Sequence, residues 1–384
     1  MVCIKYLTII LIIGILFVFL STIPSASHER STSVSKYRAQ LRCDRQAVPN
    51  DHSKQIENEP TVSKSYEEAI DLASMCTSSN RKLIAFTSGN LAIHRFMINL
   101  QLLIQKLHNP FPLIHVPLDE KCLSTLTSLS NISLNILDIG KMKNTFPSDG
   151  AEFRQKAYNQ MALVKWKLAL EFLKLGVDVL VLDPDIVLLR NPIPYFDTIP
   201  PCDMSFQIDS FTNYSSNFIK AHGGYSFEDL GNYHIDNFYN TGFILHRSNL
   251  RTISHITEYL KHAESEYEHG ANVDDQNIWN HWMQDNMHYA NVGINSPLTE
   301  RGQYAYAKIV NGECFEYVRN SNSSNIAISI NALTPALFPS RPQLFEVKQL
   351  DELLMRPFMW HANWLFGLES KERLIRENNQ WLVQ

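Results

Sequence analysis

The chain has little net charge and no cluster of basic residues. It carries 34 Lys and Arg against 39 Asp and Glu, a net charge of −5 over 384 residues, and its pI is near 6.3. Such a surface has no general attraction for nucleic acid or anionic headgroups, so no nucleic-acid partner is expected. Hydrophobic residues make up 45% of the chain and charged residues 19%, which indicates a globular protein with a sizeable core. We see no internal repeat and no linker to a second domain.

Long apolar runs are also scarce, and only the amino-terminal one approaches the length of a membrane span. Residues 7–23 contain no charge, and as a helix they rise about 25 Å, enough for a thin bilayer of the secretory pathway. This length favours an uncleaved signal anchor, and the small residues 25–27 leave a cleaved signal peptide as the alternative. Lys5 on the short amino-terminal side then places the remaining chain in the lumen.

Cysteine is infrequent, and no Cys-x-x-Cys pair or zinc-like spacing occurs. Cys3 falls on the cytosolic or membrane side of the anchor, and the other five fall in an oxidising compartment: Cys43, Cys76, Cys122, Cys202 and Cys314. Because five is odd, one stays free or pairs between chains. Three N-glycosylation sequons agree with a luminal address, and they begin at Asn131, Asn213 and Asn322.

The luminal part divides into a stalk and a folded body. Residues 24–80 have the polar composition of a stalk, with a helical pattern only at 66–75. In residues 81–384 the pattern alternates, with strands at 82–86, 113–117, 134–139 and 177–182 and helices at 91–107 and 151–175. This predicts a single α/β domain with a mostly parallel central sheet flanked by helices. Shorter strands at 203–208 and 238–246 and helices at 249–267 and from 274 follow.

Two carboxylates follow the most apolar of these strands. Residues 177–182 are aliphatic except for Asp178, and Pro184 separates Asp183 from Asp185 directly after them. This fits a strand covered on both faces that ends at the proline. Ligands of open α/β sheets bind beyond the carboxyl ends of strands, where carboxylate oxygens suit Mn²⁺ or Mg²⁺. We therefore predict a metal site here, with a plain strand-ending turn as the alternative.

Four separated motifs follow one another along the chain: Leu182-Asp-Pro-Asp-Ile-Val-Leu-Leu-Arg-Asn-Pro192, Asn240-Thr-Gly-Phe-Ile-Leu-His-Arg-Ser248, Asp274-Asp-Gln276 and His361-Ala-Asn-Trp364. In this order they resemble the nucleotide-diphospho-sugar transferase family of GT-A fold, nearest to its retaining α-xylosyl-, α-galactosyl- and arabinosyltransferases. The resemblance covers residues 82–384. It implies a Golgi type II membrane glycosyltransferase that moves a sugar from a nucleotide-diphosphate sugar, expected to be a UDP-sugar, to a glycan or glycoprotein acceptor with retention.

The resemblance also implies roles for the motifs. Asp183 and Asp185 become ligands of Mn²⁺ or Mg²⁺ and, through the ion, of the donor diphosphate, and His361 becomes a third metal ligand. Gly367 and Lys371 match the glycine and lysine that follow this histidine and approach the diphosphate, although a solvated helix charge also explains Lys371. The residues implied around the reacting sugar are Asn240, Asp275 and Gln276, with Thr241, Gly242 and Asp274 as donor-binding neighbours.

Donor contacts are expected at two further places. The loop after the first strand would hold the base and ribose through Thr87, Ser88 and Asn90. On the long helix before the metal strand, Arg154 and Lys165 are within reach of the diphosphate or sugar, with Lys167 competing for the second role and surface charges as the alternative. Local alternatives also remain for a bulge or tight turn at 240–242 and for a helix N-cap at 274–275.

Two other functions remain open. The strand ending in Asp183 and Asp185 also resembles the nucleophile motif of haloacid-dehalogenase phosphohydrolases, although the chain has no Gly-Asp pair for the rest of that site. A membrane-tethered carbohydrate-binding protein without turnover is the other. For a retaining transferase we prefer same-face substitution, in which the leaving phosphate takes the acceptor proton, because no residue stands out as a protein nucleophile.

Overall fold

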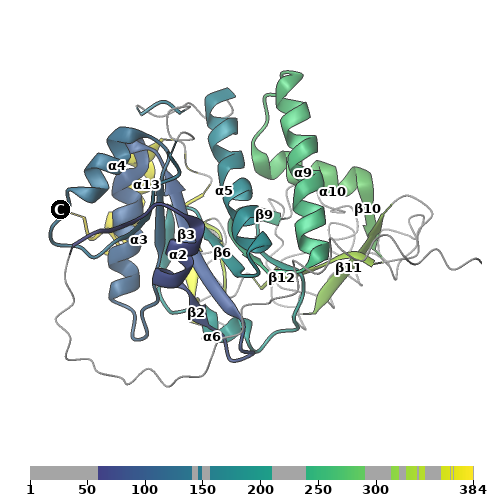
Figure 1. The fold of residues 1–384 in the computed structure, drawn as a ribbon, viewed down its shortest axis with the longest axis horizontal. Helices are drawn as coiled ribbons and strands as arrows, with labels where there is room; N and C mark the ends of the chain where they lie inside the picture. The colour runs from purple at the N-terminus through teal and green to yellow at the C-terminus, as the bar shows by residue number, and fades with distance from the viewer. Residues whose placement is uncertain are drawn as a thin grey trace, which may run out of the picture. The chain divides into compact units, whose positions relative to one another are not determined.

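The computed structural model describes residues 59–140, 146–148, 156–209, 239–289, 313–319, 326–334, 337–341, 356–363, 365 and 367–383. Its centre is an eleven-stranded sheet in the order β1-β5-β4-β3-β6-β9-β8-β12-β11-β10, with β2 paired to β3 (Figure 1). The strands are β1 Thr61–Ser63, β2 Met75–Cys76, β3 Lys82–Gly89, β4 Ile114–Pro117, β5 Asn135–Leu137, β6 Asp178–Leu182, β8 Met204–Ile208, β9 Tyr239–His246, β10 Met287–Tyr289, β11 Cys314–Arg319 and β12 Ile326–Leu333.

Most strands of this sheet run in one direction. The pairings that join β1, β5, β4, β3 and β6 are parallel, and so is the pairing of β8 with β12. Strand β9 lies antiparallel between β6 and β8, which gives β8 the direction of β6. Only β2, β9 and β11 run the other way. The predicted α/β fold with a mostly parallel central sheet is therefore confirmed.

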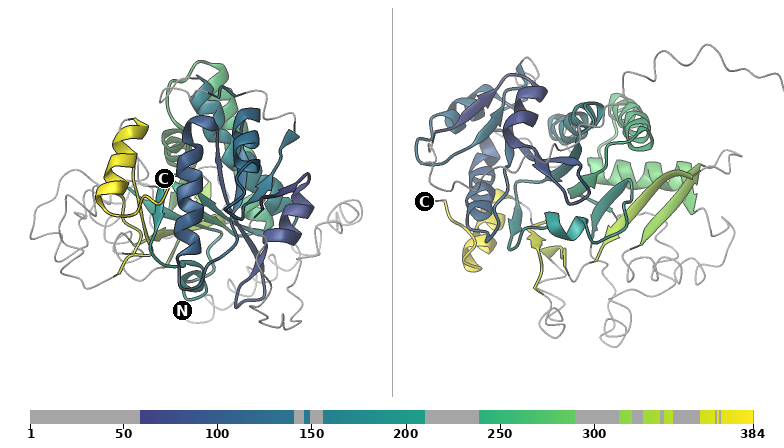
Figure 2. Two further views of the ribbon diagram at one scale, coloured as in Figure 1. Left: turned by 90° about the vertical axis from the view of Figure 1, so that its left-hand side faces the viewer. Right: turned by 60° about the horizontal axis from the view of Figure 1, so that its bottom comes forward.

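Helices cover both faces of the sheet. One face packs against α2 (Tyr66–Ala73), α5 (Lys156–Lys174), α9 (Leu250–Glu268) and α10 (Asp275–Asn286). The other packs against α3 (His94–Gln105, after the short η2 at Leu91–Ile93) and α6 (Ile193–Phe196), while α4 (Glu120–Thr127) and α13 (Leu368–Glu377) lie beside α3. The right-hand view of Figure 2 shows α5 and α9 nearly end-on, next to each other on one side of the sheet.

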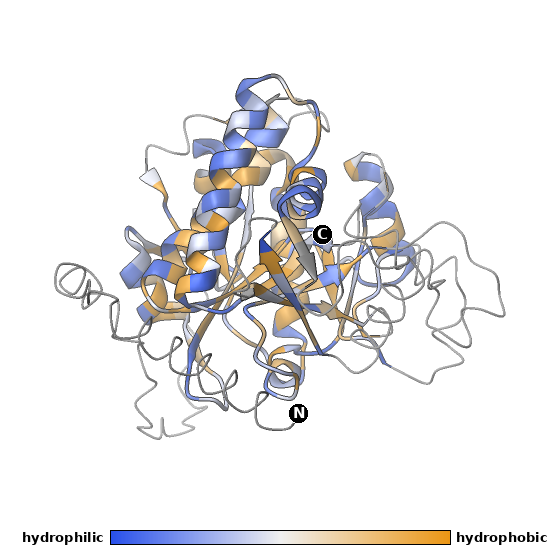
Figure 3. Ribbon diagram, turned by 90° about the vertical axis from the view of Figure 1, so that its right-hand side faces the viewer, coloured by the Kyte–Doolittle hydropathy of each residue, from blue (hydrophilic) through white to orange (hydrophobic). Residues whose placement is uncertain are grey.

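The sequence of strand β6 explains why helices pack on both faces of the sheet. All five of its residues are buried, and its apolar side chains alternate. Val179 and Val181 pack toward α5 and α9, whereas Leu180 and Leu182 pack toward α3 and α6. Figure 3 shows this pattern for the fold as a whole, with hydrophobic residues gathered along the strands and hydrophilic ones on the outer sides of the helices. The predicted strand with two covered faces is confirmed.

The folded unit begins before the boundary that composition suggests. The helix expected at 66–75 is present as α2, but Ala69, Ile70 and Ala73 bury its inner face in the core. Strand β1 extends the sheet beside β5, and β2 pairs with β3. Residues 61–76 are thus part of the sheet unit and not of a stalk.

The signal anchor predicted at residues 7–23 lies outside the described residues. Within the described ranges, no helix is long and apolar enough to cross a membrane. Anchor, topology and compartment stay predictions.

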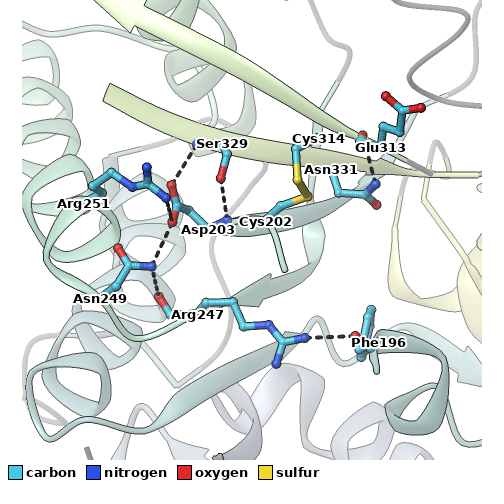
Figure 4. Close-up of a disulfide and its surroundings, with 10 residues drawn as sticks. All are labelled: Phe196, Cys202, Asp203, Arg247, Asn249, Arg251, Glu313, Cys314, Ser329 and Asn331. Carbon is cyan, nitrogen blue, oxygen red and sulfur yellow. Dashed lines mark hydrogen bonds and ion pairs between the residues drawn. A yellow bond between two sulfur atoms is a disulfide. The ribbon is translucent and has the colours of Figure 1, made fainter. Parts of the chain in front are cut away.

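A disulfide joins Cys202, just before β8, to Cys314, the first residue of β11 (Figure 4). Beside it, the buried Asp203 carboxylate accepts hydrogen bonds from Asn249, from Arg251 and from the backbone N–H of Ser329, so this end of the sheet is cross-linked twice. Cys76 is also disulfide-bonded. Cys122 is a buried free thiol, which agrees with the free-cysteine alternative, and burial raises its pKa to about 12.

Candidate functional site

Asp183, Asp185 and His361 meet although the last two lie 176 positions apart in the sequence. Asp183 follows β6 and Asp185 precedes β7 (Ile186–Leu188), which pairs antiparallel with β13 (Met359–His361). In this register His361 lies opposite Ile186, and the N–H of Ala362 donates to the carbonyl of Asp185. One ligand atom from each of the three side chains lies within 4.8 Å of the others. This group can hold a divalent metal ion.

The hydrogen bonds of His361 orient its ring for metal binding. Nδ1 lies 3.2 Å from Gln207 Oε1, and the Gln207 amide is itself oriented by donating from Nε2 to the carbonyl of Phe338. Nδ1 is therefore a donor, so in the neutral ring the lone pair is on Nε2, 3.1 Å from Asp185 Oδ1. Two lone-pair atoms at this separation need a shared proton or a cation, and an oriented imidazole beside carboxylates suits a metal.

The backbone leaves room for these ligands only because residue 242 is glycine. A Cβ at Gly242 would lie 2.3 Å from His361 Cε1 and 2.9 Å from Asp183 Oδ2. The carbonyl of Gly242 also accepts the N–H of Asp183 at 2.7 Å. Here β9 departs from its register with β8, since Phe206 faces Ile244 but Gln207 faces Asn240. This break in register agrees with the bulge alternative for 240–242, and it lies at the site itself.

Lys371, on the first turns of α13, donates to Asp185 Oδ2 at 2.6 Å. Burial alone would raise the pKa of Asp185, but the Lys371 ammonium and His361 outweigh it and hold this pKa well below the usual range. Gly367 is the N-cap of α13 with φ of +81°, a conformation that favours glycine, and its lack of a side chain leaves the helix start open. Lys371 is thus a partner of the metal group and not a solvated charge.

Lys165 connects the metal group to the start of α10. Its buried ammonium lies 3.2 Å from Asp183 Oδ1, 3.3 Å from Thr241 Oγ1 and 3.3 Å from Asp275 Oδ2. Burial by itself lowers the pKa of Lys165. The carboxylates of Asp183 and Asp275 raise it by a larger amount, so the net pKa is above the ordinary lysine value. Lys167, the competing candidate, pairs with Glu264 on the surface.

Residues 274–276 divide structural and site roles. Asp274 is the N-cap of α10, since its Oδ1 accepts from the N–H of Asn277 at 2.8 Å. Asp275 is 4% exposed, and its Oδ2 accepts from Trp166 Nε1 at 3.0 Å as well as from Lys165. Gln276 accepts the N–H of Thr241 through Oε1. The acid–amide pair thus lies against β9 and close to the metal group.

A carboxylate that the sequence reasoning missed joins three of the motifs. Asp209 Oδ1 accepts from Asn240 Nδ2 at 2.9 Å and from Asn363 Nδ2 at 2.8 Å, and its Oδ2 accepts from Gln276 Nε2 at 2.7 Å. A signal for it exists, because Asp209 directly follows the buried strand β8 as Asp183 follows β6. Gln207 was also missed, although an amide in an otherwise apolar strand is a comparable signal.

The family model for nucleotide-diphospho-sugar transferases matches residues 112–375, more than half of the chain. The chain belongs to this family. The predicted class of nucleotide-sugar glycosyltransferase is therefore supported, and the phosphohydrolase alternative is set aside.

Among solved structures, the transferase is similar to the galactosyltransferase LgtC in complex with donor and acceptor sugar analogues, with 11% identity, a TM-score of 0.40, and coverage of 76% of this chain and 95% of that one. It is also similar to the glycosyltransferase GlyE of Streptococcus pneumoniae TIGR4, with 12% identity, a TM-score of 0.38, and coverage of 78% and 61%. A third is mouse xyloside xylosyltransferase 1 in its apo form, with 11% identity, a TM-score of 0.36, and coverage of 73% of this chain and 97% of that one. No curated protein sequence matches the chain.

Two of the donor contacts that the transferase was expected to make from a loop lie within β3. Thr87 is fully buried there, whereas Ser88 is partly exposed. The side-chain amide of Asn90 donates to the carbonyl of Pro147. Arg154 lies outside the described residues, as do Asn213 and Asn322. Asn131 is exposed, which suits a glycosylation acceptor. The donor-binding roles of Thr87, Ser88 and Asn90 stay predictions.

Proposed function

We propose that the chain is a metal-dependent, retaining glycosyltransferase that uses a UDP-sugar as donor and a glycan or glycoprotein as acceptor. The observation that carries this proposal is the group of Asp183, Asp185 and His361, with two ammonium groups bonded to its carboxylates. Cations arranged in this way match a diphosphate leaving group, on which negative charge develops as the glycosidic bond breaks.

Asp183, Asp185 and His361 would hold Mn²⁺, or alternatively Mg²⁺, and the two carboxylates and one imidazole suit the first of these. The ion would supply Lewis-acid stabilisation of the diphosphate. Lys371 would add a fixed positive charge from α13, whose start at Gly367 leaves backbone N–H groups accessible to phosphate oxygens. Lys165 lies between the carboxylates of Asp183 and Asp275, and its positive charge offsets their mutual repulsion.

On the sugar side, Asp275, Gln276 and Asn240 would hold the hydroxyl groups. The amides of Gln276 and Asn240 are both oriented by Asp209. Same-face substitution is supported because the candidate carboxylates are engaged: Asp275 by Lys165 and Trp166, and Asp209 by three amides. The leaving phosphate would then accept the proton of the attacking acceptor hydroxyl.

We further propose a Golgi type II membrane placement with the transferase domain in the lumen. The disulfide between Cys202 and Cys314 and the exposed sequon at Asn131 support an oxidising compartment.

The test is to incubate the full-length protein, in detergent, with UDP- and GDP-sugars and Mn²⁺, and to measure donor consumption. We expect one UDP-sugar to be consumed, with loss of consumption on chelation and in Asp185→Ala. Asp71→Asn, on the exposed side of α2, serves as the matched control and should behave as wild type. Consumption that is unchanged in Asp185→Ala would refute the proposal. Binding of a nucleotide sugar without consumption would instead support the carbohydrate-binding alternative.

A further inference from the structure

Three buried aromatic side chains from three helices pack into a cluster behind the site. Trp166 on α5 stacks on Trp279 of α10, with ring centroids 4.7 Å apart and an interplanar angle of 23°. Tyr259 on α9 lies 4.7 Å from Trp166 and 5.0 Å from Trp279. None of the three is more than 1% exposed. The cluster therefore joins α5, α9 and α10 at one place in the core.

The polar atoms of this cluster are not equivalent. Trp166 Nε1 donates to Asp275 Oδ2 at 3.0 Å, and the Tyr259 hydroxyl donates to the carbonyl oxygen of the same aspartate. Trp279 Nε1, although buried, has no hydrogen-bond partner in the described part of the chain. Two members of the cluster thus hold Asp275, while the third contributes packing alone.

The Trp166 contact completes the orientation of the Asp275 carboxylate. Lys165 is the other donor to Oδ2, at 3.3 Å, but its ammonium is shared with Asp183 and Thr241. A flexible ammonium with three acceptors attracts the carboxylate without fixing its rotation. The indole N–H is rigid because the ring is stacked, and a donor to a charged acceptor is among the stronger hydrogen bonds. The hydrogen bond from Trp166 Nε1 holds Asp275 Oδ2 at a fixed place beside the core, so the aromatic cluster sets the rotation of the carboxylate.

We propose that Trp166 is a positioning residue of the transfer reaction, which acts by fixing the carboxylate of Asp275 toward the donor sugar. This inference rests on the proposed function, in which Asp275 contacts that sugar. Trp166 itself reaches the reacting atoms only through Asp275. Its indole N–H, and not its bulk, is the part that matters.

The test compares Trp166→Phe with Trp279→Phe in the full-length protein. Both variants remove the same atoms from the same cluster, but only the first removes a donor to Asp275. With the UDP-sugar that the wild type consumes, we expect kcat to fall about tenfold or more in Trp166→Phe, with the donor KM within about twofold. Trp279→Phe should retain kcat within about threefold. Equal losses in the two variants would overturn the inference.

A double-mutant cycle shows whether the effect passes through Asp275. In an Asp275→Ala background, where residue 275 has no side-chain acceptor for the indole N–H, Trp166→Phe should change the residual kcat by less than about twofold, and a loss as large as in the wild type would overturn the inference. If Trp166→Phe does not fold, 3-benzothienylalanine at position 166 keeps the ring shape without the N–H and should show the same loss. A wild type that consumes no donor refutes the proposed function and this inference with it, whereas an active wild type with equal variants refutes the inference alone.

Discussion

Gly242 shows how strongly one residue can constrain the site. Its conformation does not require glycine, but the space around it does, because a Cβ would lie 2.3 Å from a ring carbon of His361 and 2.9 Å from Asp183 Oδ2. In Gly242→Ala the imidazole or the carboxylate must therefore move away from the ligand group. We expect the affinity for Mn²⁺ to fall at least about tenfold, measured by calorimetry or by the electron paramagnetic resonance of free Mn²⁺.

The readout for Gly242→Ala is metal binding without a donor, so it does not depend on turnover. His361→Gln, which removes the imidazole ligand, gives the size of the effect to compare with. Thermal unfolding in chelator separates a loss of fold from a loss of the site. Wild-type Mn²⁺ affinity in folded Gly242→Ala would show that the ligand group is not the metal site.

At the residue scale, sequence reasoning found the carboxylates and missed the residues that orient them. Asp183 and Asp185 were predictable because a strand end places its side chains in a known direction. His361 came from the family resemblance, since the β7–β13 pairing that brings it to Asp185 is formed by residues far apart in the chain. Gln207 and Asp209 act by hydrogen bonding to other site residues, and such partners cannot be assigned before the strand order is known.

At the scale of elements, the start of β6 carries a charge cluster whose role is structural. Asp178, the one polar residue of this strand, is fully buried. Its carboxylate accepts from Arg81 Nε at 2.7 Å, from Arg247 Nη1 at 3.1 Å and from the N–H of Ser248 at 2.7 Å. These bonds join the start of β6 to the starts of β3 and α9, at the opposite end of β6 from the metal group.

Asp178→Asn should destabilise the fold without altering the site. The amide cannot pair with both guanidinium groups, and Arg247 is largely buried, so we expect a loss of about 3 kcal/mol in the free energy of unfolding. Urea unfolding measures it. Glu171→Gln removes the exposed pair with Lys174 on α5 and should cost no more than about 0.5 kcal/mol. Similar losses in both variants would mean that burial does not strengthen the Asp178 cluster.

The long elements were predictable and the short ones were not. The helix expected at 151–175 and the strand expected at 177–182 appear as α5, which ends at Lys174, and β6, which spans Asp178–Leu182; residues 151–155 lie outside the described residues. Both were predictable because their apolar periodicity is strong. Strands of two or three residues such as β1, β2, β7 and β13 carry no periodic signal. They form because a neighbouring strand offers unpaired backbone groups, which depends on tertiary structure.

For the whole molecule, composition misplaced the edge of the folded unit. Residues 24–80 taken together have the polar composition of a stalk, yet the inner face of α2 and the pairing of β1 and β2 add residues 61–76 to the sheet. A helix that buries only one of its sides needs few apolar residues. Average composition therefore sets the stalk boundary too late, although the helical pattern at 66–75 was recognised within it.

Three buried histidines make the stability of the whole fold dependent on pH. His115, His246 and His255 are at most 2% exposed, and burial lowers the pKa of each to about 3. In the unfolded chain the same groups titrate near 6.5, so below this pH the unfolded state binds protons that the folded state does not. The stability that the three neutral histidines contribute is therefore fully present well above pH 6.5, and it is lost as the pH falls toward 3. From pH 7 to 5.5 we expect a loss of about 1.3 kcal/mol per histidine, about 4 kcal/mol together.

Urea unfolding at these two pH values measures the loss, and single substitutions assign it. Both ring nitrogens of His246 lack partners within the described ranges, and its neighbours Trp166 and Phe206 are aromatic. His246→Phe should therefore be tolerated and should remove about a third of the pH dependence, because one of three similar groups no longer titrates. His108→Gln replaces an exposed histidine and should leave the dependence unchanged. Equal stability at pH 7 and 5.5, or an unchanged dependence in His246→Phe, would mean that these histidines are protonated as readily in the folded state as in the unfolded chain.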